Sequence, residues 1–196
     1  MATIRAATLQ DLPGTYRVAL LTGDAGRDAS GLFHNPELLG HLYVGPYVVG
    51  QPDLASVIAD EDGVAGYGLA AADTRAFEAW MEAGWWPTLR EQYPARSDAS
   101  PDAELIALIH APEVAAEDVL VDYPSHLHVD LLERVRGQGN GRLLIERMLA
   151  QLRERGSPGV HLGVASTNAN AIAFYRHLGF DVVADEPDEL TMGLRL

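Results

Sequence analysis

The sequence predicts one α/β domain over residues 1–196, with a sheet of six to seven strands. Its length suits a single domain of ordinary size. Strand-like stretches are interleaved with stretches whose apolar residues recur at helical spacing. Two pairs of strand-like stretches flank the acidic turns 60–63 and 185–189, which is the pattern of hairpins. No internal repeat or linker interrupts this pattern.

The first half of the chain predicts short elements around a long loop. Thr8 suits the N-cap of a helix, with Pro13 in its first turn. The glycines and prolines of 22–52 predict a loop with one short helix, and loops of that length are usually functional. Asp73 is expected to cap the next helix. The expected strands are 3–7, 55–59 and 64–72; the expected helices are 9–21, 73–83, 85–93 and 103–109; the acidic stretch 112–118 leads into the next strand.

The second half is more regular. In the helix expected over 141–155, the apolar residues follow helical spacing, and a Gly-Ser-Pro-Gly sequence ends it. Gly179 ends a second helix in the same way. The expected strands are 125–132, 160–164, 180–184 and 190–196, and the expected helices are 141–155 and 168–178.

Composition excludes several classes of function. The chain has 28 acidic and 14 basic residues, all of them arginine, for a net charge of −14, so nucleic acids and acidic membranes are poor partners. Cysteine is absent, which excludes disulfides, thiolate metal sites and a cysteine nucleophile. No apolar run approaches the ~20 residues of a membrane span, and the N-terminus lacks a signal-peptide pattern. We therefore expect a cytoplasmic protein.

A basic segment stands out within this acidic chain. Residues 134–176 hold seven arginines and two glutamates, and Arg136 and Arg142 enclose the glycine-rich run 137–141 between a strand and a helix. Glycines permit positive φ, and the first amides of a helix lack internal partners, so the run suits a pyrophosphate. A P-loop would need a lysine, and a dinucleotide fingerprint needs different glycine spacing. A tight structural turn is the alternative interpretation.

Two motifs in this region carry a family resemblance. Arg136-Gly137-Gln138-Gly139-Asn140-Gly141, led in by Asp130-Leu131-Leu132, resembles the (Gln/Arg)-x-x-Gly-x-(Gly/Ala) signature of the GCN5-related N-acetyltransferases (GNAT). The stretch from Asn168 through Ala171, Phe174 and Tyr175 to Phe180 resembles the second motif of that family. A narrower resemblance links the chain to the acetyltransferase-like C-terminal domain of O-GlcNAcase and its stand-alone bacterial relatives. It lies in 22–26, 31–33, 43–47, 66–67 and 123–125.

The resemblance implies a mixed, mostly antiparallel sheet with helices on both faces, splayed where acetyl-CoA binds as a cosubstrate. Strand backbone would pair with the pantetheine arm, amides of the glycine-rich turn would hold the pyrophosphate, and an arginine would reach the 3′-phosphate. The implied contacts to pantetheine are Val129, Leu131, Leu132 and Asn168, with Asn170 as a further candidate. Those to pyrophosphate are Arg136, Gly137, Gln138, Gly139, Asn140, Gly141 and Arg142. Arg142 or Arg176 would meet the 3′-phosphate, and Ala171 and Phe174 would pack against the cofactor.

The resemblance also makes Tyr175 the candidate catalytic acid. When an amine attacks the thioester, CoA leaves as a thiolate, and a phenol beside the sulfur can supply the proton that this thiolate needs. Without the motif, a tyrosine on the inner face of a helix is a core residue.

The catalytic base has several candidates, because an amine is mostly protonated at neutral pH. Alternation along the strand 125–132 puts His126, His128 and Asp130 on one face, where they could relay a proton. Asp122, near the start of this strand, is a second carboxylate candidate. Two histidines at i and i+2 can also face a zinc ion, although the cofactor site explains the region without metal. A solvated polar face is the remaining interpretation.

These observations favour an acetyl-CoA-dependent N-acetyltransferase acting by direct attack in a ternary complex. An acetyl-CoA- or peptide-binding module of the same fold with little turnover is the second hypothesis, and a structural protein without a nucleotide site is the third. The acceptor would be an amine-bearing small molecule or peptide, drawn in by acidic surroundings and walled by Asp24, Tyr43 and Tyr47. A homodimer is common among proteins of this family.

Overall fold

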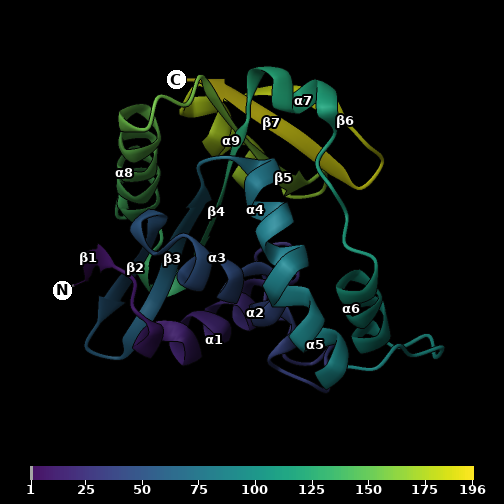
Figure 1. Cartoon of the computed structure of the whole chain (residues 1–196). Helices are drawn as coiled ribbons and strands as arrows, with labels where there is room; N and C mark the ends of the chain where they lie inside the picture. Colours follow the sequence, from purple (N-terminus) through teal and green to yellow (C-terminus); the bar gives the residue numbers. More distant parts are fainter. Residues whose placement is uncertain (1) are drawn as a thin grey trace.

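A seven-stranded mixed sheet forms the centre of the computed structural model, which describes residues 2–196 (Figure 1). Its strands are β1 (Thr3–Ala6), β2 (Ala55–Asp60), β3 (Gly63–Ala71), β4 (Ser125–Leu131), β5 (Gly159–Ala165), β6 (Asp181–Asp185) and β7 (Glu189–Arg195). The order across the sheet is β1-β2-β3-β4-β5-β7-β6. Only β4 and β5 pair in parallel; every other neighbouring pair is antiparallel. The predicted fold class is confirmed.

Helices cover both faces of this sheet. The α-helices are α1 (Leu12–Thr22), α2 (Leu38–Tyr43), α3 (Gly45–Gly50), α4 (Thr74–Trp80), α5 (Trp86–Gln92), α6 (Pro101–His110), α7 (Glu117–Asp122), α8 (Asn140–Glu154) and α9 (Ala169–His177). Short turns are η1 (Leu9–Asp11), η2 (Pro52–Leu54), η4 (Glu133–Val135) and the π-helical η3 (Met81–Trp85), which joins α4 to α5. Gly68 of β3 lies against Met148 of α8. Tyr67 and Leu69 of the same strand pack with Val18 of α1 on the opposite face.

Local sequence accounts for several of these elements. In α8 the buried residues are Leu144, Ile145, Met148, Leu149 and Leu152, which is the apolar stripe that helical spacing predicts. The Asp73 side chain accepts a hydrogen bond from the backbone amide of Ala76 (2.9 Å) and so caps α4 as expected. Gly63 adopts a φ of 98° in the turn between β2 and β3, which a residue with a side chain rarely adopts.

Two predictions about the first half were wrong. The segment 22–52 holds two short helices, α2 and α3, rather than one. Its glycines and prolines indicate a loop, but Leu38, Leu42 and Tyr47 are buried in the core, and such packing stabilises helices too short to form alone. The acidic stretch also does not lead directly into a strand, because α7 precedes β4.

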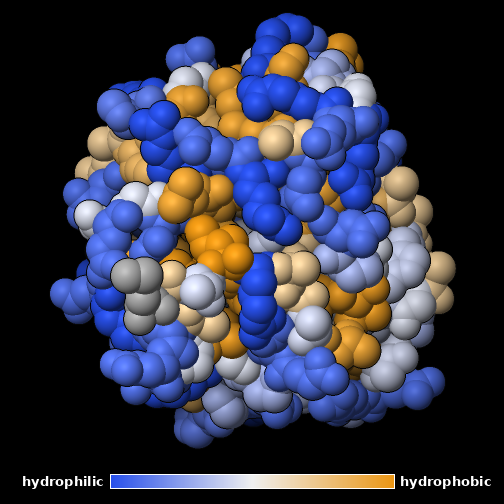
Figure 2. All heavy atoms as spheres, turned by 90° about the vertical axis from the view of Figure 1, so that its left-hand side faces the viewer, coloured by the Kyte–Doolittle hydropathy of each residue, from blue (hydrophilic) through white to orange (hydrophobic). Residues whose placement is uncertain are grey.

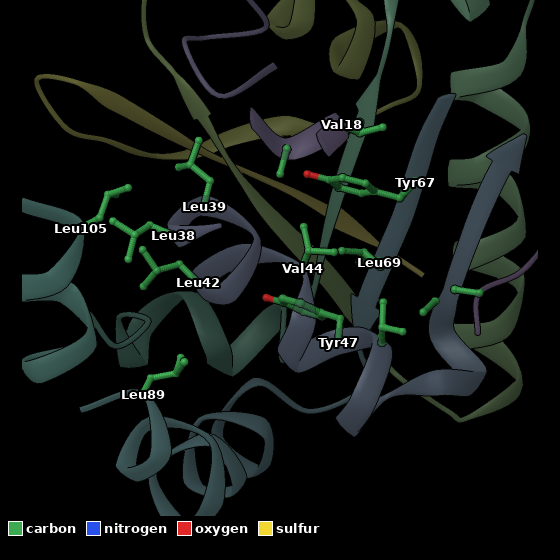
Figure 3. Packing of buried hydrophobic residues seen from close by; sticks show 14 of the residues in the cluster. Val18, Leu38, Leu39, Leu42, Val44, Tyr47, Tyr67, Leu69, Leu89 and Leu105 are labelled. Carbon is green, nitrogen blue, oxygen red and sulfur yellow. The ribbon is translucent and has the colours of Figure 1, made fainter. Parts of the chain in front are cut away.

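Aromatic and aliphatic side chains fill the core on the α1–α3 side of the sheet. Figure 3 shows Tyr67 on β3 and Tyr47 on α3 as two layers of this core, with Val44 and Leu69 between the rings and both hydroxyls pointing the same way. A phenol buried in such a core normally needs a hydrogen-bond partner for its hydroxyl. The partners of both hydroxyls are polar residues of β4, so this core leads directly to the candidate site.

The face on the α8 side of the molecule is mostly hydrophilic, with hydrophobic groups between the polar side chains (Figure 2). This agrees with the amphipathic pattern of α8, whose apolar stripe is turned toward the sheet. Among the helices of residues 2–196, none is long and apolar enough to cross a membrane.

Candidate functional site

The strands β4 and β5 separate from each other soon after they meet. They pair at Ser125↔Val160 and His126↔His161, whereas on its other edge β4 pairs with β3 as far as Leu131. In an antiparallel pair, alternate residues turn their backbone groups toward the partner strand. The amide of Leu132, just past the end of β4, donates to the carbonyl of Ala65 in β3 (2.8 Å), which sets the phase of this alternation. The backbone groups of 127, 129 and 131 therefore face the gap that opens between β4 and β5, called the splay below.

The alternation of backbone direction distinguishes among the three strand residues expected to contact pantetheine. Val129 and Leu131 present backbone groups to the splay. Leu132 does not: its amide is bonded to Ala65, and its carbonyl accepts from the amide of Val135 (3.1 Å). The expectation for Leu132 is therefore corrected, because both of its backbone groups already have protein partners.

The glycine-rich turn lies beyond the end of β4 and opens into α8. Gly137 and Gly139 have φ values of 72° and 80°, and no atom lies within 4 Å of where a Cβ would stand on either residue. Over the described part of the chain, no backbone amide of 137–142 donates a hydrogen bond to another protein group. A row of open amide donors at a helix N-terminus can bind a pyrophosphate, so the chemistry of this turn fits the implied cofactor.

The polar side chains of this turn are used within the protein. Gln138 Nε2 donates to the carbonyl of Arg134 (3.0 Å), and Asn140 Nδ2 donates to that of Val135 (2.9 Å). Arg142 Nε donates to Glu146 one helical turn away (2.6 Å). An anion at this turn would therefore be held mainly by the main chain.

The two arginines expected near the 3′-phosphate lie on the surface. Arg142 lines a hollow of about 330 Å³ between α8 and α9, together with Arg153 and His177. Arg176 is exposed and forms no ion pair with another described residue. Asn170, the further pantetheine candidate, is also exposed.

The turn at Ala25 and Gly26 accepts hydrogen bonds from residues that follow both of the separated strands, β4 and β5. Arg136 donates to the carbonyls of Leu131 (2.7 Å) and Gly26 (3.0 Å). The side chain of Asn168 caps α9 by accepting from Ala171 and donates to the carbonyl of Ala25 (3.2 Å). Two residues of the family motifs thus meet the predicted functional loop at neighbouring carbonyls.

The inner face of α9 carries the aromatic residues of the second motif. Tyr175 is buried, and its ring lies 5.7 Å from that of Phe180 in an edge-on arrangement. Phe174 is half-buried and reaches Gly141, where its ring would lie 3.3 Å from an added Cβ, and Leu131 approaches the same point equally closely. Ala171 is half-buried. The structure therefore brings Gly141, Leu131 and Phe174 together at the splay.

Asp130 is the carboxylate at the centre of this region. Its Oδ2 accepts a hydrogen bond from the Tyr67 hydroxyl (2.7 Å), and Tyr67 is its partner across the β3–β4 register. Burial raises the pKa of Asp130 to about 6, with the Tyr67 hydrogen bond opposing the rise. A carboxylate with this pKa is a stronger base than an exposed aspartate and is still mostly ionised at neutral pH.

The phenol of Tyr175 has the opposite electrostatic character. Burial, and next the charge of Asp130, raise the pKa of Tyr175 well above its ordinary value, so the phenol stays protonated. Among described residues that are not exposed, only His41 and Gln151 have fully enclosed side-chain polar atoms without a hydrogen bond. The Tyr175 hydroxyl has no protein partner among the described residues and is not among these atoms, so it is not fully enclosed.

The two histidines of β4 share one partner. The Tyr47 hydroxyl lies 2.6 Å from His126 Nε2 and 2.9 Å from His128 Nε2. This contact occupies the ring nitrogens that a bridging zinc ion would need, so the zinc interpretation does not fit the geometry. Among the described residues, no group of three or more His, Cys, Asp or Glu side chains is arranged to hold a metal.

Asp122 is not brought to this cluster. It lies on α7, before the start of β4, whereas Asp130 lies at the other end of that strand. Its carboxylate accepts from Arg195 at the end of β7 (2.6 Å). The expectation of a catalytic role for Asp122 therefore lacks geometric support.

Sequence reasoning missed the site roles of Tyr67 and Thr74 and placed Tyr47 only in a wall of the acceptor site. Tyr67 alternates with Leu69 and looks like an ordinary core residue until β3 and β4 are set in register. Thr74 looks like a helix-start residue, yet its hydroxyl meets His126 Nδ1 at 2.8 Å. The β3–β4 register, which places Tyr67 beside Asp130, was not among the pairings that the sequence predicted.

Known proteins resemble this chain in both sequence and fold. The Acetyltransferase (GNAT) family matches residues 45–180. Protein O-GlcNAcase from Rattus norvegicus and from Mus musculus are each 29% identical over 148 residues, which is 74% of this chain but only 16% of each relative.

Solved structures extend the likeness to the whole chain. The structure of SsHAT is 37% identical, covers 99% of this chain and 98% of its own, and superposes with a TM-score of 0.93. PH1933 from Pyrococcus horikoshii OT3 shares the fold at 14% identity, with a TM-score of 0.65 over 100% of this chain and 99% of its own. The expected resemblance to O-GlcNAcase-like acetyltransferases is confirmed, and the chain belongs to the acetyltransferase (GNAT) family of acyltransferases.

Proposed function

We propose that this protein is an acetyl-CoA-dependent N-acetyltransferase that transfers the acetyl group to an amine by direct attack within a ternary complex. The observation that carries the proposal is the row of open amides at 137–142, placed beside the splay that also receives Asp130 and Tyr175. Acetyl-CoA would supply an activated acetyl thioester. The amides would hold its pyrophosphate, and the backbones of Val129 and Leu131 would hold its pantetheine arm.

The two ionisable groups have complementary roles in this proposal. Asp130 is ionised above a pH of about 6 and can take a proton from the attacking amine. Tyr175 stays protonated and can give its proton to the departing thiolate as the C–S bond breaks and the C–N bond forms. Environments that separate two pKa values in this way are typical of an acid and base pair.

Acidic surroundings support an acceptor that carries positive charge. Residues 1–120 hold six arginines and 18 acidic residues, and this segment supplies α1–α3 on the Asp130 side of the sheet. A cationic amine would be attracted toward such a surface. The acceptor class is therefore a small molecule or peptide with a primary amine.

Two measurements test the proposal in sequence. Calorimetric titration with acetyl-CoA should show binding at one site per chain. Free-thiol release over a panel of amines and peptides should then show turnover that depends on the acceptor. Binding without release on any acceptor would favour the binding-module hypothesis, and an absence of binding would reject both.

A further inference from the structure

A chain of hydrogen bonds runs from a backbone carbonyl to His128. Thr74, the first residue of α4, is buried, and its hydroxyl lies 2.7 Å from the carbonyl oxygen of Pro124 and 2.8 Å from His126 Nδ1. His126 Nε2 lies 2.6 Å from the Tyr47 hydroxyl, which lies 2.9 Å from His128 Nε2. Every contact has the length of a hydrogen bond, so each must contain one proton.

The carbonyl at one end sets the direction of every proton in this chain. A carbonyl oxygen only accepts, so the Thr74 hydroxyl gives its single proton to Pro124. His126 must then donate to Thr74 from Nδ1, which leaves its Nε2 as an acceptor for the Tyr47 hydroxyl. The Tyr47 hydroxyl donates its one proton to His126 Nε2, so its oxygen accepts from His128 Nε2–H. In a neutral imidazole only one nitrogen carries hydrogen, so His128 Nδ1 has a free lone pair.

This direction holds while both imidazoles are neutral. Burial lowers the pKa of His126 well below its ordinary value and that of His128 to about 4. The titratable neighbours of the chain do not reverse this: His161 packs 5.7 Å from His126 and disfavours its charge, and Tyr47 stays protonated. Burial raises the pKa of Tyr47 and lowers that of His161; the charge of Glu78 of α4 adds to the first shift and opposes the second. The charge of Glu78 is not a cause of the shifts at His126 or His128.

The free nitrogen of His128 is available to a ligand. Within the described chain, Nδ1 makes no hydrogen bond and is not among the enclosed polar atoms that lack one. Asp130 is two residues further along the same face of β4; besides Tyr67 it has the Thr22 hydroxyl as a neighbour, whose proton goes to the carbonyl of Val18 (2.8 Å). Asp130 Oδ1 is not among the enclosed polar atoms that lack a hydrogen bond. His128 Nδ1 and Asp130 Oδ1 are therefore two hydrogen-bond acceptors, neither of which carries a hydrogen, on one face of β4 beside the splay.

We propose that the Pro124 carbonyl, acting through Thr74, His126 and Tyr47, holds His128 in the Nε2–H tautomer, so that His128 Nδ1 and Asp130 together receive the N–H groups of a primary amine. The identification of this ligand as the acceptor rests on the proposed function, whereas the tautomer does not. Thr74, His126 and Tyr47 are positioning residues, because each acts through its neighbour. An amine with two N–H donors can satisfy both acceptors, which a hydroxyl with one cannot.

The tautomers can be observed directly in the folded protein. Long-range ¹H–¹⁵N correlation spectra of the ¹⁵N-labelled chain should show His126 protonated at Nδ1 and His128 protonated at Nε2. Thr74→Val keeps the shape of the side chain but removes the oxygen that receives His126 Nδ1–H, so both histidines should lose their single tautomer. Thr74→Ser should restore it. A wild-type His128 protonated at Nδ1 would overturn the proposal.

A kinetic measurement tests the link to the acceptor. Thr74→Val should raise the KM for a primary amine roughly five- to tenfold, the scale of one hydrogen bond, with an unchanged Kd for acetyl-CoA. Thr15→Val is the matched control, since Thr15 is also buried and donates to a carbonyl, that of Leu12 (3.0 Å), but touches no histidine. An equal rise in KM in both variants would refute the positioning role. If the chain has no turnover, the proposed function fails while the spectra still decide the tautomer.

Discussion

The ionised form of Asp130 should cost the protein stability, and removing its charge should recover it. Its pKa rises from an ordinary value of 3.8 to about 6, and each pKa unit corresponds to about 1.4 kcal/mol, so the cost is at most about 3 kcal/mol. Asp130→Asn keeps an oxygen that can accept from Tyr67, removes the charge and replaces the second carboxylate oxygen with an NH2 group. At pH 8 we expect the variant to be more stable than the wild type by about 1–3 kcal/mol.

The sign of the pH dependence follows from the protons bound in each state. Between pH 4 and pH 6 the folded protein keeps the Asp130 proton and the unfolded chain has lost it, so wild-type stability falls as the pH rises. The advantage of Asp130→Asn should therefore grow by about 2 kcal/mol from pH 4.5 to pH 8. Urea unfolding at the two pH values measures it. An advantage that does not change with pH would refute the reasoning.

The same substitution should remove activity. Asn cannot take a proton from the amine, so kcat/KM should fall by about a hundredfold or more in the free-thiol assay. A variant that is more stable at pH 8 but inactive would indicate that the site holds a charge at the expense of folding. A variant that is more stable and fully active would exclude Asp130 as the base and leave the electrostatic argument standing.

Three further substitutions test other parts of the structure. Tyr175→Phe should lower kcat about a hundredfold with an unchanged acetyl-CoA Kd, because only the proton donor is lost; equal turnover would remove this residue from the mechanism. Gly139→Val should weaken acetyl-CoA binding at least about tenfold in calorimetry, since a branched residue is strained at a φ of 80° and crowds the open amides. Gly84→Ala, where a Cβ meets no atom within 4 Å, is its control, and equal affinity in both variants would reject the pyrophosphate placement. Asp11→Asn should cost about 2 kcal/mol at neutral pH, because Arg5 lowers the pKa of Asp11 to about 2. That stability is present above about pH 4 and is lost as the pH falls through 2, so a urea-unfolding difference that stays constant from pH 7 to pH 3 would contradict it.

Most secondary structure was predictable because its signals are local. The apolar stripe of α8, the cap at Asp73 and the turn at Gly63 each depend on neighbouring residues alone. The error in 22–52 arose where tertiary burial stabilises helices of six residues that local propensity does not support. The six-residue helix α7 was missed as well, although Val119 is its one buried residue.

The candidate site divides in the same way. Its motifs are short and continuous, so Asp130, Tyr175 and the amides of 137–142 could be selected from residue order and spacing. The backbone role of Leu132 could not be judged in advance, because it depends on which edge of β4 its amide faces. The isolation of Asp122 likewise depends on the ion pair with Arg195, which is 73 positions away in the chain.

Residue order alone was enough to indicate the family and to select the glycine-rich turn and the candidate acid and base, because these are properties of contiguous segments. Folding was needed to place the Tyr67 hydroxyl on Asp130 and to join Thr74, His126 and Tyr47 into one chain of hydrogen bonds. Those contacts join elements 50 or more residues apart, and burial makes each of them consequential. In a medium of low polarity, a single hydroxyl can decide the charge of a carboxylate or the tautomer of an imidazole.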